Sequence, residues 1–382
     1  GYDMDARRIE KLREKYGAGC GSIRFTSLEE ELSRAAFYIV TVLTPVDERK
    51  NPDLTCLVEA TRTVARYLKR GDYVVYESTV YPGCTEEVCV PLLEKGSGLK
   101  LGADFKVGYS PERINPNDSE HTFSNTAKIV SANDGQALDE VARVYAEVVA
   151  ADLCRASGIR VAEAAKMTEN VQRSVNIALM NELQRLFSRM GIDMGEVIDM
   201  ASSKWNFVKY RPGLGGGHCI PVDPLYLVSA ASKLGVEMPV TSSGCAVNDG
   251  MAAYVVRSLL GAMGSDGRGA RALLMGVTYK ENIDDIRNSR IAEMVGLLER
   301  EGMSVDVTDP HADPDKVYAM YGIRPVPALR PPYDLIVVAV AHDEYRGLDD
   351  AYFRSISRGA ALLGDIRGLY KGRIKSLGYW SL

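Results

Sequence analysis

The sequence has no excess of positive charge, no long apolar run and no paired cysteines, and each absence excludes a class of protein. Its 46 Lys and Arg residues are outnumbered by 51 Asp and Glu residues, which gives a formal charge of −5. A chain without a basic field is a poor partner for nucleic acid. No stretch approaches the ~18 consecutive apolar residues of a membrane span, and no secretory signal pattern is visible. We therefore expect neither nucleic acid nor a membrane as partner.

Seven cysteines are scattered at positions 20, 56, 84, 89, 154, 219 and 245. None belongs to a CxxC pair of the kind that binds zinc or builds a disulfide framework. We therefore expect no metal site and a reduced, cytosolic chain. Most thiols in such chains are apolar filler, so only the surrounding sequence can single one out.

The chain opens on residues 1–3, inside what reads as the end of a strand, and residues 5–16 follow with helical spacing. Gly17, Gly19 and Gly21 then resemble a GxGxG fingerprint, but a phosphate loop follows a strand and opens a helix. We interpret these glycines as a helix end and a loop. A glycine-rich phosphate loop is expected in an N-terminal segment before residue 1.

Apolar strands alternate with helices in two parts of the chain, residues 1–150 and 265–382. The first part has predicted strands at 37–43, 73–77, 105–109 and 127–131, and helices at 54–68 and 85–95. The second part has predicted strands at 272–277, 304–309, 335–341 and 361–366. This alternation predicts parallel sheets covered on both faces, with ligands bound beyond the carboxyl ends of the strands.

Residues 151–264 have a helical pattern. Ile159–Met190 contains neither Pro nor Gly, and a helix of ~30 residues spans ~45 Å, enough to bridge two domains or to pack a dimer. A second helical stretch is expected at 238–257. The predicted fold class is α/β, with two Rossmann-like doubly wound domains joined by a central helical domain with a long helix.

Polar residues follow the first strands. Asp3, just before a helix, can accept hydrogen bonds from the ribose hydroxyls of NAD or cap the helix, and the sequence leaves both open. Thr44-Pro45 and Ser78-Thr79 end two successive strands. Their hydroxyls can bind nicotinamide, ribose or a catalytic water, and the alternative is a turn built by Pro and Thr. We place all five residues in an NAD site.

Glu112 and Arg113 follow the strand that ends at Tyr109, and we place both in a substrate site. Glu112 is a candidate general base; a surface turn with a local ion pair is the alternative. Lys166 and Asn170 are four residues apart and share one face of a helix. A buried Lys is costly unless it serves a ligand, and this one could stabilise an oxyanion. A solvated lysine is the alternative.

The stretch 213–223, GLGGGHCIPVD, is the most informative one. Its glycines, Gly216 among them, allow backbone to approach a bulky ligand, and Cys219 would be presented directly after them. Asp223 could orient a base or a water. A thiol nucleophile divides aldehyde oxidation into thiohemiacetal formation, hydride transfer and thioester hydrolysis. A flexible turn followed by a buried cysteine is the less favoured interpretation.

Basic residues follow three strands of the second α/β part. They are Lys280 and Arg287 after the first strand, His342 and Arg346 after the third, and Arg367 after the fourth. Lys and Arg at strand ends suit a pyrophosphate. A surface charge run is the alternative at the first of these sites. We expect an anionic ligand at this edge.

Taken together, these residues resemble the UDP-glucose/GDP-mannose dehydrogenase family over essentially the whole chain. The resemblance rests on GYDMD, LTPVD, ESTVYPG, YSPERINP, the helix from Lys166 to Asn170, GGHCIPVDP, TYKENIDDIRNS and DIRG. The motifs SPERINP and GGHCIPVDP are similar to those of the branch that acts on UDP-N-acetylhexosamines. The resemblance implies NAD as cofactor, a UDP-sugar as substrate and a homodimer formed through the central helices.

The resemblance also implies a four-electron oxidation at C6 of the sugar. Cys219 would form the thiohemiacetal and the thioester, and Lys166 would stabilise the oxyanion. Asn170 would help hold the substrate, and Asp223 would support proton transfer and water activation.

Further roles follow from the same resemblance. Glu112 would assist thioester hydrolysis, with Thr79 positioning water, and Lys280, Arg287 and Arg367 would lie near the nucleotide. Three alternatives remain: a UDP-glucose 6-dehydrogenase, a two-electron hydroxyacid dehydrogenase that would not need Cys219, and a catalytically silent nucleotide-sugar binding protein.

Overall fold

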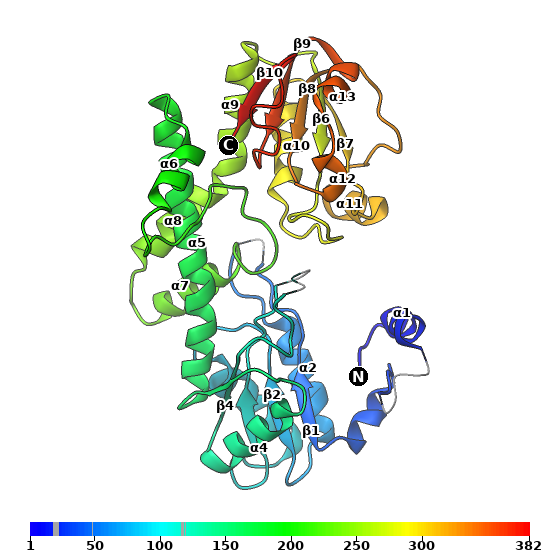
Figure 1. The fold of residues 1–382 in the computed structure, drawn as a ribbon. Coiled ribbons are helices and arrows are strands. Elements are labelled where there is room, and N and C mark those ends of the chain that lie inside the picture. Colours follow the sequence, from blue (N-terminus) through cyan, green and yellow to red (C-terminus); the bar gives the residue numbers. More distant parts are fainter. Residues whose placement is uncertain (18–22, 48, 116–117, 119) are drawn as a thin grey trace. The chain divides into compact units, whose positions relative to one another are not determined.

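The computed structural model describes residues 1–17, 23–47, 49–115, 118 and 120–382 (Figure 1). These fall into two compact units, Gly1–Thr168 and Glu169–Leu382. The division lies within the long helix α5 (Ile159–Arg189), which the sequence predicted at 159–190. Domain boundaries at residues 150 and 264 stay a prediction. Gly19 and Gly21 lie outside the described residues.

The first unit contains a five-stranded sheet in the order β1-β2-β3-β4-β5. Its strands are β1 Phe37–Val40, β2 Tyr73–Tyr76, β3 Lys106–Tyr109, β4 Lys128–Ala132 and β5 Leu153–Arg155. Its other elements are α1 Ala6–Tyr16, the 3-10 helix η1 Glu29–Arg34, α2 Thr55–Tyr67, the π-helical turn η2 Thr85–Cys89, α3 Val90–Ser97 and α4 Gly135–Ala146.

One strand pair of this sheet departs from the prediction. β3 and β4 are antiparallel, whereas the other neighbours are parallel. A parallel connection needs a crossover element, and the described residues between β3 and β4 contain no helix. The expectation of a wholly parallel sheet is therefore wrong here, and the first residue of β4 lies at the carboxyl end of β3.

Alternating side chains of β2 face opposite layers of the first unit. Val75 packs with Val141 and Tyr145 of α4, while the hydroxyl of Tyr76 lies 3.1 Å from that of Thr61 in α2. Successive residues of a strand point to opposite faces. Helices therefore cover both faces of the sheet.

The second unit contains a parallel sheet in the order β10-β9-β8-β6-β7. Its strands are β6 Arg271–Met275, β7 Ser304–Thr308, β8 Tyr333–Val338, β9 Ser357–Asp365 and β10 Gly378–Ser381. Its helices after α5 are α6 Met194–Ala201, α7 Asp223–Lys233, α8 Pro239–Asp249, α9 Met251–Met263, α10 Arg290–Arg300, α11 Pro314–Tyr321, α12 Asp343–Arg346 and α13 Asp350–Ser355.

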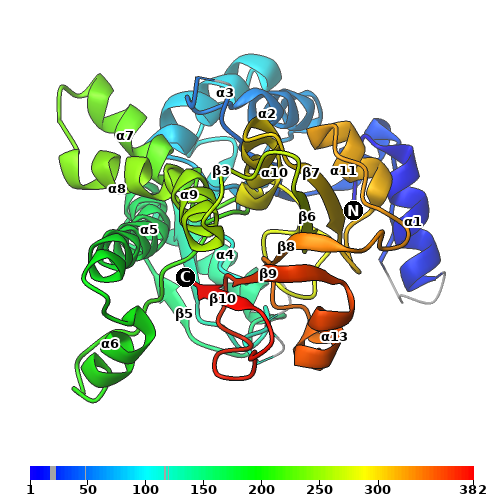
Figure 2. The same cartoon turned by 90° about the horizontal axis from the view of Figure 1, so that it is seen from above.

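Both faces of this second sheet are buried. Leu274 and Val337 pack with residues of α9 and α10, whereas Met275 and Val338 pack with Phe353 of α13 on the other face. Figure 2 shows α9 and α10 on one side of the strands and α13 on the other. The doubly wound α/β fold predicted from the sequence is confirmed.

The helical part differs in detail from the prediction. The stretch expected at 238–257 is two helices, α8 and α9, which meet at Gly250, a residue of low helix propensity. α6 and α7 were not predicted. Each helix of the described residues is too short or too polar to cross a bilayer.

Candidate active site

The loop that carries Cys219 is held at its start by α5. Asn181 is fully buried. Its carboxamide accepts the N–H of Gly213 at 2.9 Å and donates to the carbonyl of Gly213 at 3.2 Å. Asn181 also donates to Asn248 at 2.9 Å, and Asn248 donates to the carbonyl of Ser174 at 3.0 Å. Buried amides thus fix the point where the glycine loop begins.

The other end of the loop is held by the segment after β6. The N–H of Gly217 donates to the carbonyl of Arg287 at 3.1 Å, and Asn288 donates to the carbonyl of Gly217 at 2.9 Å. A Cβ on Gly216 would lie 2.8 Å from Tyr279, and one on Gly217 2.7 Å from the same side chain. Glycine is required at both positions because no side chain fits this approach.

Cys219 is exposed, so its thiol is not sealed in packing. Its carbonyl accepts the N–H of Asp223 at 2.9 Å, where α7 begins. The pKa of Arg287 lies above its ordinary value, chiefly through its hydrogen bond to Asp285, and a smaller contribution comes from Cys219.

A buried polar pair links α5 to the start of α7. Asn170 donates to a carboxylate oxygen of Asp223 at 2.5 Å, and the two side chains are 5% and 1% exposed. Lys166 lies one turn earlier on α5 and is 6% exposed. The alternative of a solvated lysine is therefore wrong. The structure brings together Asn170 and Asp223.

Lys280 and Arg287 follow β6, and the strand order of the second sheet reverses between β6 and β8, which is the usual ligand position in such sheets. Arg367 follows β9. Arg287 makes an ion pair with both carboxylate oxygens of Asp285. A Cβ on Gly213 would lie 3.8 Å from the guanidinium of Arg367, which is exposed. Arg287 and Arg367 thus both lie beside the Cys219 loop.

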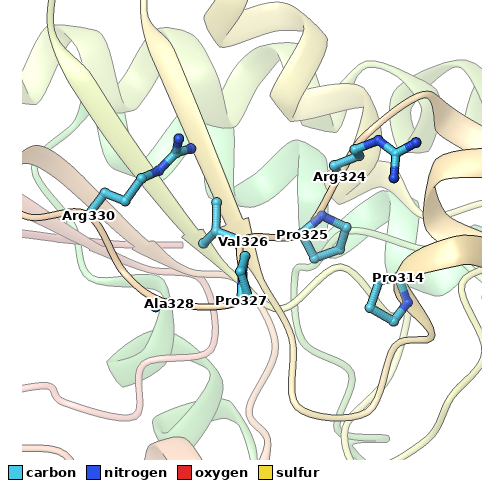
Figure 3. Close-up of a pocket in the computed structure, with 7 residues that line it drawn as sticks. All are labelled: Pro314, Arg324, Pro325, Val326, Pro327, Ala328 and Arg330. Carbon is cyan, nitrogen blue, oxygen red and sulfur yellow. The ribbon is translucent and has the colours of Figure 1, made fainter.

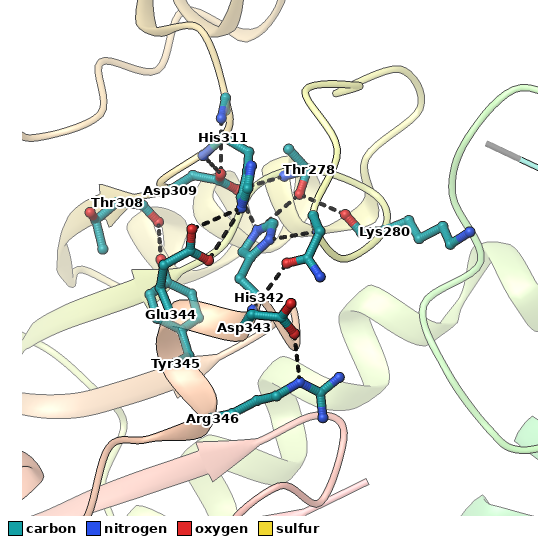
Figure 4. Close-up of polar contacts among 12 residues, drawn as sticks. Thr278, Lys280, Thr308, Asp309, His311, His342, Asp343, Glu344, Tyr345 and Arg346 are labelled. Carbon is teal, nitrogen blue, oxygen red and sulfur yellow. Dashed lines mark hydrogen bonds and ion pairs between the residues drawn. The ribbon is translucent and has the colours of Figure 1, made fainter. Parts of the chain in front are cut away.

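His342, at the end of β8, does not offer a charge to a ligand (Figure 4). The ring is fully buried. Its Nδ1 accepts the N–H of Asn282 at 3.0 Å, and its Nε2 lies 3.1 Å from the hydroxyl of Thr278 and 3.2 Å from Asp309. The expectation that His342 contributes to anion binding is wrong. Instead, it braces residues 278–282, which carry Lys280.

The same histidine decides whether this cluster binds a metal. His311, His342 and Glu344 come within metal-ligand reach of one another in the described part of the chain. Because Nδ1 of His342 accepts a backbone N–H, the proton resides on Nε2 and points to Asp309 or Thr278. Neither nitrogen then presents a lone pair to an ion.

Burial favours a higher pKa for Asp309, but hydrogen bonds from His342, Val277 and Thr278 outweigh it and lower that pKa.

In the first unit, the ends of β1 and β2 are bonded to each other. The hydroxyl of Thr44 donates to the carbonyl of Thr79 at 2.7 Å, and that of Ser78 donates to the carbonyl of Val42 at 2.6 Å. The carbonyl of Pro45 accepts the N–H of Asp53 at 2.9 Å. These hydroxyl protons stabilise the turns, and their oxygens remain able to accept from a ligand.

Glu112 and Arg113 lie in the loop after β3. One oxygen of the Glu112 carboxylate accepts the N–H groups of Arg113 at 2.6 Å and of Ile114 at 2.5 Å. Arg113 donates to the carbonyl of Ala127 at 2.6 Å. The loop is therefore ordered around both side chains.

Asp3 is not the helix cap that the sequence allowed. Asp5 caps α1 by accepting the N–H of Arg7. Asp3 accepts the N–H of Asp5 at 2.9 Å and lies 3.4 Å from the guanidinium of Arg8. Next to it, Tyr2 forms a single parallel bridge with Thr26 in place of the expected strand.

Sequence reasoning missed the buried groups that support these loops, including Glu77, Lys128, Asn181 and Asn248. A lone charged or amide residue within an apolar element was the only signal in the sequence for these groups.

A hollow lined by Pro314 and residues of the segment 324–330 (Figure 3) contains none of the predicted site residues.

Comparison with known proteins identifies the family of this chain. The chain matches three parts of the UDP-glucose/GDP-mannose dehydrogenase family: the NAD binding domain over residues 3–149, the central domain over 160–250 and the UDP binding domain over 273–372. It is 44% identical over 383 residues to the UDP-N-acetyl-D-glucosamine 6-dehydrogenase of Pseudomonas aeruginosa, covering 97% of this chain and 91% of the relative. It is 42% identical to the protein of that name from Salmonella typhi, covering 96% and 90%.

A solved structure shows the same fold. The UDP-D-ManNAc dehydrogenase from Pyrococcus horikoshii aligns with a TM-score of 0.89 at 27% identity, covering 100% of this chain and 92% of that one. The fold and the three matched domains are those of an NAD-dependent dehydrogenase. The chain belongs to the UDP-glucose/GDP-mannose dehydrogenase family. It is therefore a nucleotide-sugar dehydrogenase with NAD as cofactor, and both predictions are confirmed.

Proposed function

We propose that this chain oxidises the C6 alcohol of a UDP-N-acetylhexosamine to the uronic acid in two successive two-electron steps, with Cys219 as the nucleophile. The observation that carries the proposal is the exposed Cys219, at the end of a loop held at both ends. Two relatives above 40% identity are named UDP-N-acetyl-D-glucosamine 6-dehydrogenases, which favours an acetamido sugar.

The chemistry follows from the residues. The Cys219 thiolate adds to the aldehyde carbon, the resulting thiohemiacetal is oxidised to a thioester, and water releases the acid. Lys166 stabilises the oxyanion, while Asn170 holds the sugar and Asp223 supports proton transfer. Glu112 assists the hydrolysis.

Two sets of side chains bind the ligands. NAD, when bound, accepts a hydride in each oxidation, and the polar edge made by β1 and β2 suits its ribose and carboxamide. The residues that would hold NAD are Asp3, Thr44, Pro45, Ser78 and Thr79, and Thr79 also positions the water. The residues that would hold the substrate, besides those named above, are Arg113, Gly216, Lys280, Arg287 and Arg367.

The test is Cys219→Ser, with Cys245→Ser in α8 as the matched control. We expect the control to release two NADH per sugar and the Cys219 variant to form no acid. Acid formation by Cys219→Ser at the parent rate would instead indicate a two-electron dehydrogenase that does not need the thiol. Failure of the parent to bind NAD would indicate a binding protein.

The substrate is tested by NADH release from UDP-GlcNAc, UDP-ManNAc, UDP-GalNAc and UDP-glucose at equal concentration. We expect an acetamido sugar to give the highest kcat/KM. A higher value for UDP-glucose would overturn the acetamido assignment and leave the dehydrogenase chemistry intact.

A homodimer through the central helices is also proposed. Leu179 and Leu186 of α5 and Met190, the residue directly after it, are 49%, 53% and 60% exposed, and their spacings of seven and four residues place them on one face. An apolar stripe of this kind is typical of an interface. Light scattering of the purified protein should give twice the monomer mass.

A further inference from the structure

Lys128 carries a buried charge that the chemistry above does not use. The side chain is 4% exposed. Its Nζ lies 3.1 Å from a carboxylate oxygen of Glu77, whose side chain is 9% exposed. It also lies 5.0 Å from the ring centre of Phe123 and 5.3 Å from that of Tyr145. Burying an ammonium and a carboxylate has a considerable desolvation cost. This cost indicates a role for the pair beyond stability.

The antiparallel strand β4 explains where this charge lies. Lys128 is the first residue of β4, and β4 runs against β3. Its amino end therefore meets the carboxyl ends of β2 and β3, where Glu77 and the Glu112 loop begin. A parallel β4 would place its first residue at the opposite edge of the sheet.

The carboxylate of Glu77 is fixed from a second side. The hydroxyl of Tyr145, in α4, donates to the same oxygen that Lys128 approaches, at 2.5 Å. Burial, and then the charge of Glu77, raise the pKa of Tyr145, so the phenol stays a donor. Glu77, Lys128 and Tyr145 thus form one closed network drawn from three elements.

This network holds the Glu112 loop directly. Lys128 Nζ donates to the carbonyl of Pro111 at 3.1 Å and lies 3.4 Å from that of Ser110. On the other side of Glu112, Arg113 donates to the carbonyl of Ala127, the neighbour of Lys128. The residues on both sides of Glu112 are therefore tied to two consecutive residues at the start of β4.

We infer that Lys128, paired with Glu77 and Tyr145, is a positioning residue for Glu112 in thioester hydrolysis. The inference rests on the proposed function. In that step the oxygen of water bonds to the thioester carbon, the carbon–sulfur bond breaks, and the sulfur leaves as the Cys219 thiolate. Glu112 accepts one proton of the water, and the other remains on the acid product. Misplacement of Glu112 slows this step and leaves the two oxidations unchanged.

The test compares Lys128→Met, Lys128→Arg and Tyr145→Phe with the control Lys106→Met. Lys106 begins β3, at the opposite edge of the sheet, and likewise bonds a carboxylate, Asp134 at 2.7 Å, and a carbonyl. The readouts are kcat and KM, the NADH burst, and the intact mass of acid-quenched enzyme during turnover.

We expect Lys128→Met to lower kcat about 10- to 100-fold, with KM for the UDP-sugar changed by no more than about threefold. NADH should be released in a burst before slow turnover, and the thioester on Cys219 should accumulate. Lys128→Arg should recover part of the rate, and Lys106→Met should behave as the parent.

Parent-like kcat and no adduct in Lys128→Met, while Cys219→Ser is inactive, would overturn the inference and leave the proposed function standing. Activity in Cys219→Ser would instead overturn the proposed function. If Lys128→Met does not fold, Tyr145→Phe decides, because it removes one hydroxyl: the adduct should accumulate, and its absence would refute the inference.

Discussion

The buried carboxamide of Asn181 gives the sharpest stability prediction. Asn181→Ala removes three hydrogen bonds, two to Gly213 and one to Asn248. It leaves the N–H and the carbonyl of Gly213 and an oxygen of Asn248 without this partner. Each buried polar group left unpaired costs about 1–3 kcal/mol. Because water can enter the space that the carboxamide leaves, we expect the free energy of unfolding to fall by about 3–4 kcal/mol.

The control for this prediction lies on the same helix. Asn176 donates to the carbonyl of Gln172 at the surface of α5, and Asn176→Ala should change the free energy of unfolding by less than about 0.5 kcal/mol. Urea denaturation followed by circular dichroism measures both variants. Alkylation of Cys219 by iodoacetamide should also change its rate in Asn181→Ala alone, because Gly213 begins that loop. Equal denaturation midpoints for the two variants would refute the reasoning.

Three further predictions concern pH, nucleotide affinity and assembly. Burial raises the pKa of Glu163 from 4.5 to about 6 despite hydrogen bonds from Thr85 and Gly83; its contribution to stability is therefore complete below pH 4.5 and is lost as the pH rises through about 6. The parent should lose about 2 kcal/mol more than Glu163→Gln over this window in urea titrations, and parallel curves would contradict this. His342→Ala should raise KM for the UDP-sugar about tenfold with kcat nearly unchanged, and unchanged UDP affinity by calorimetry would exclude the bracing role. Leu186→Glu should give monomers in light scattering, and a persistent dimer would place the interface elsewhere.

The doubly wound sheets and the long helix could be predicted because they depend on local patterns. The strands β6 and β8 each contain a continuous apolar run, 272–275 and 335–338, as expected when both faces are covered. The position of Cys219 at the end of a loop was predictable for a related reason. The glycines that let the backbone approach Tyr279 stand next to one another in the sequence.

The supporting groups could not be predicted because they depend on contacts between distant residues. Glu77 and Lys128 are 51 positions apart, and Asn181 and Asn248 are 67 positions apart. The direction of β4 could not be predicted either, since the sequence pattern of an apolar strand is the same whether its neighbour is parallel or antiparallel. His342 was misread because a strand-end histidine and a buried, braced one look alike in the sequence.

The glycine loop before Cys219 and the segment after β6 are bonded to each other. Gly217 bonds to Arg287 and to Asn288, and Asn288 has a φ of 50°, in the left-handed region that asparagine tolerates better than most residues. A displacement of the segment after β6 therefore moves the backbone two residues from Cys219. In the proposed reaction, binding energy gained at the nucleotide, remote from the reacting carbon, can in this way be used to place the thiol.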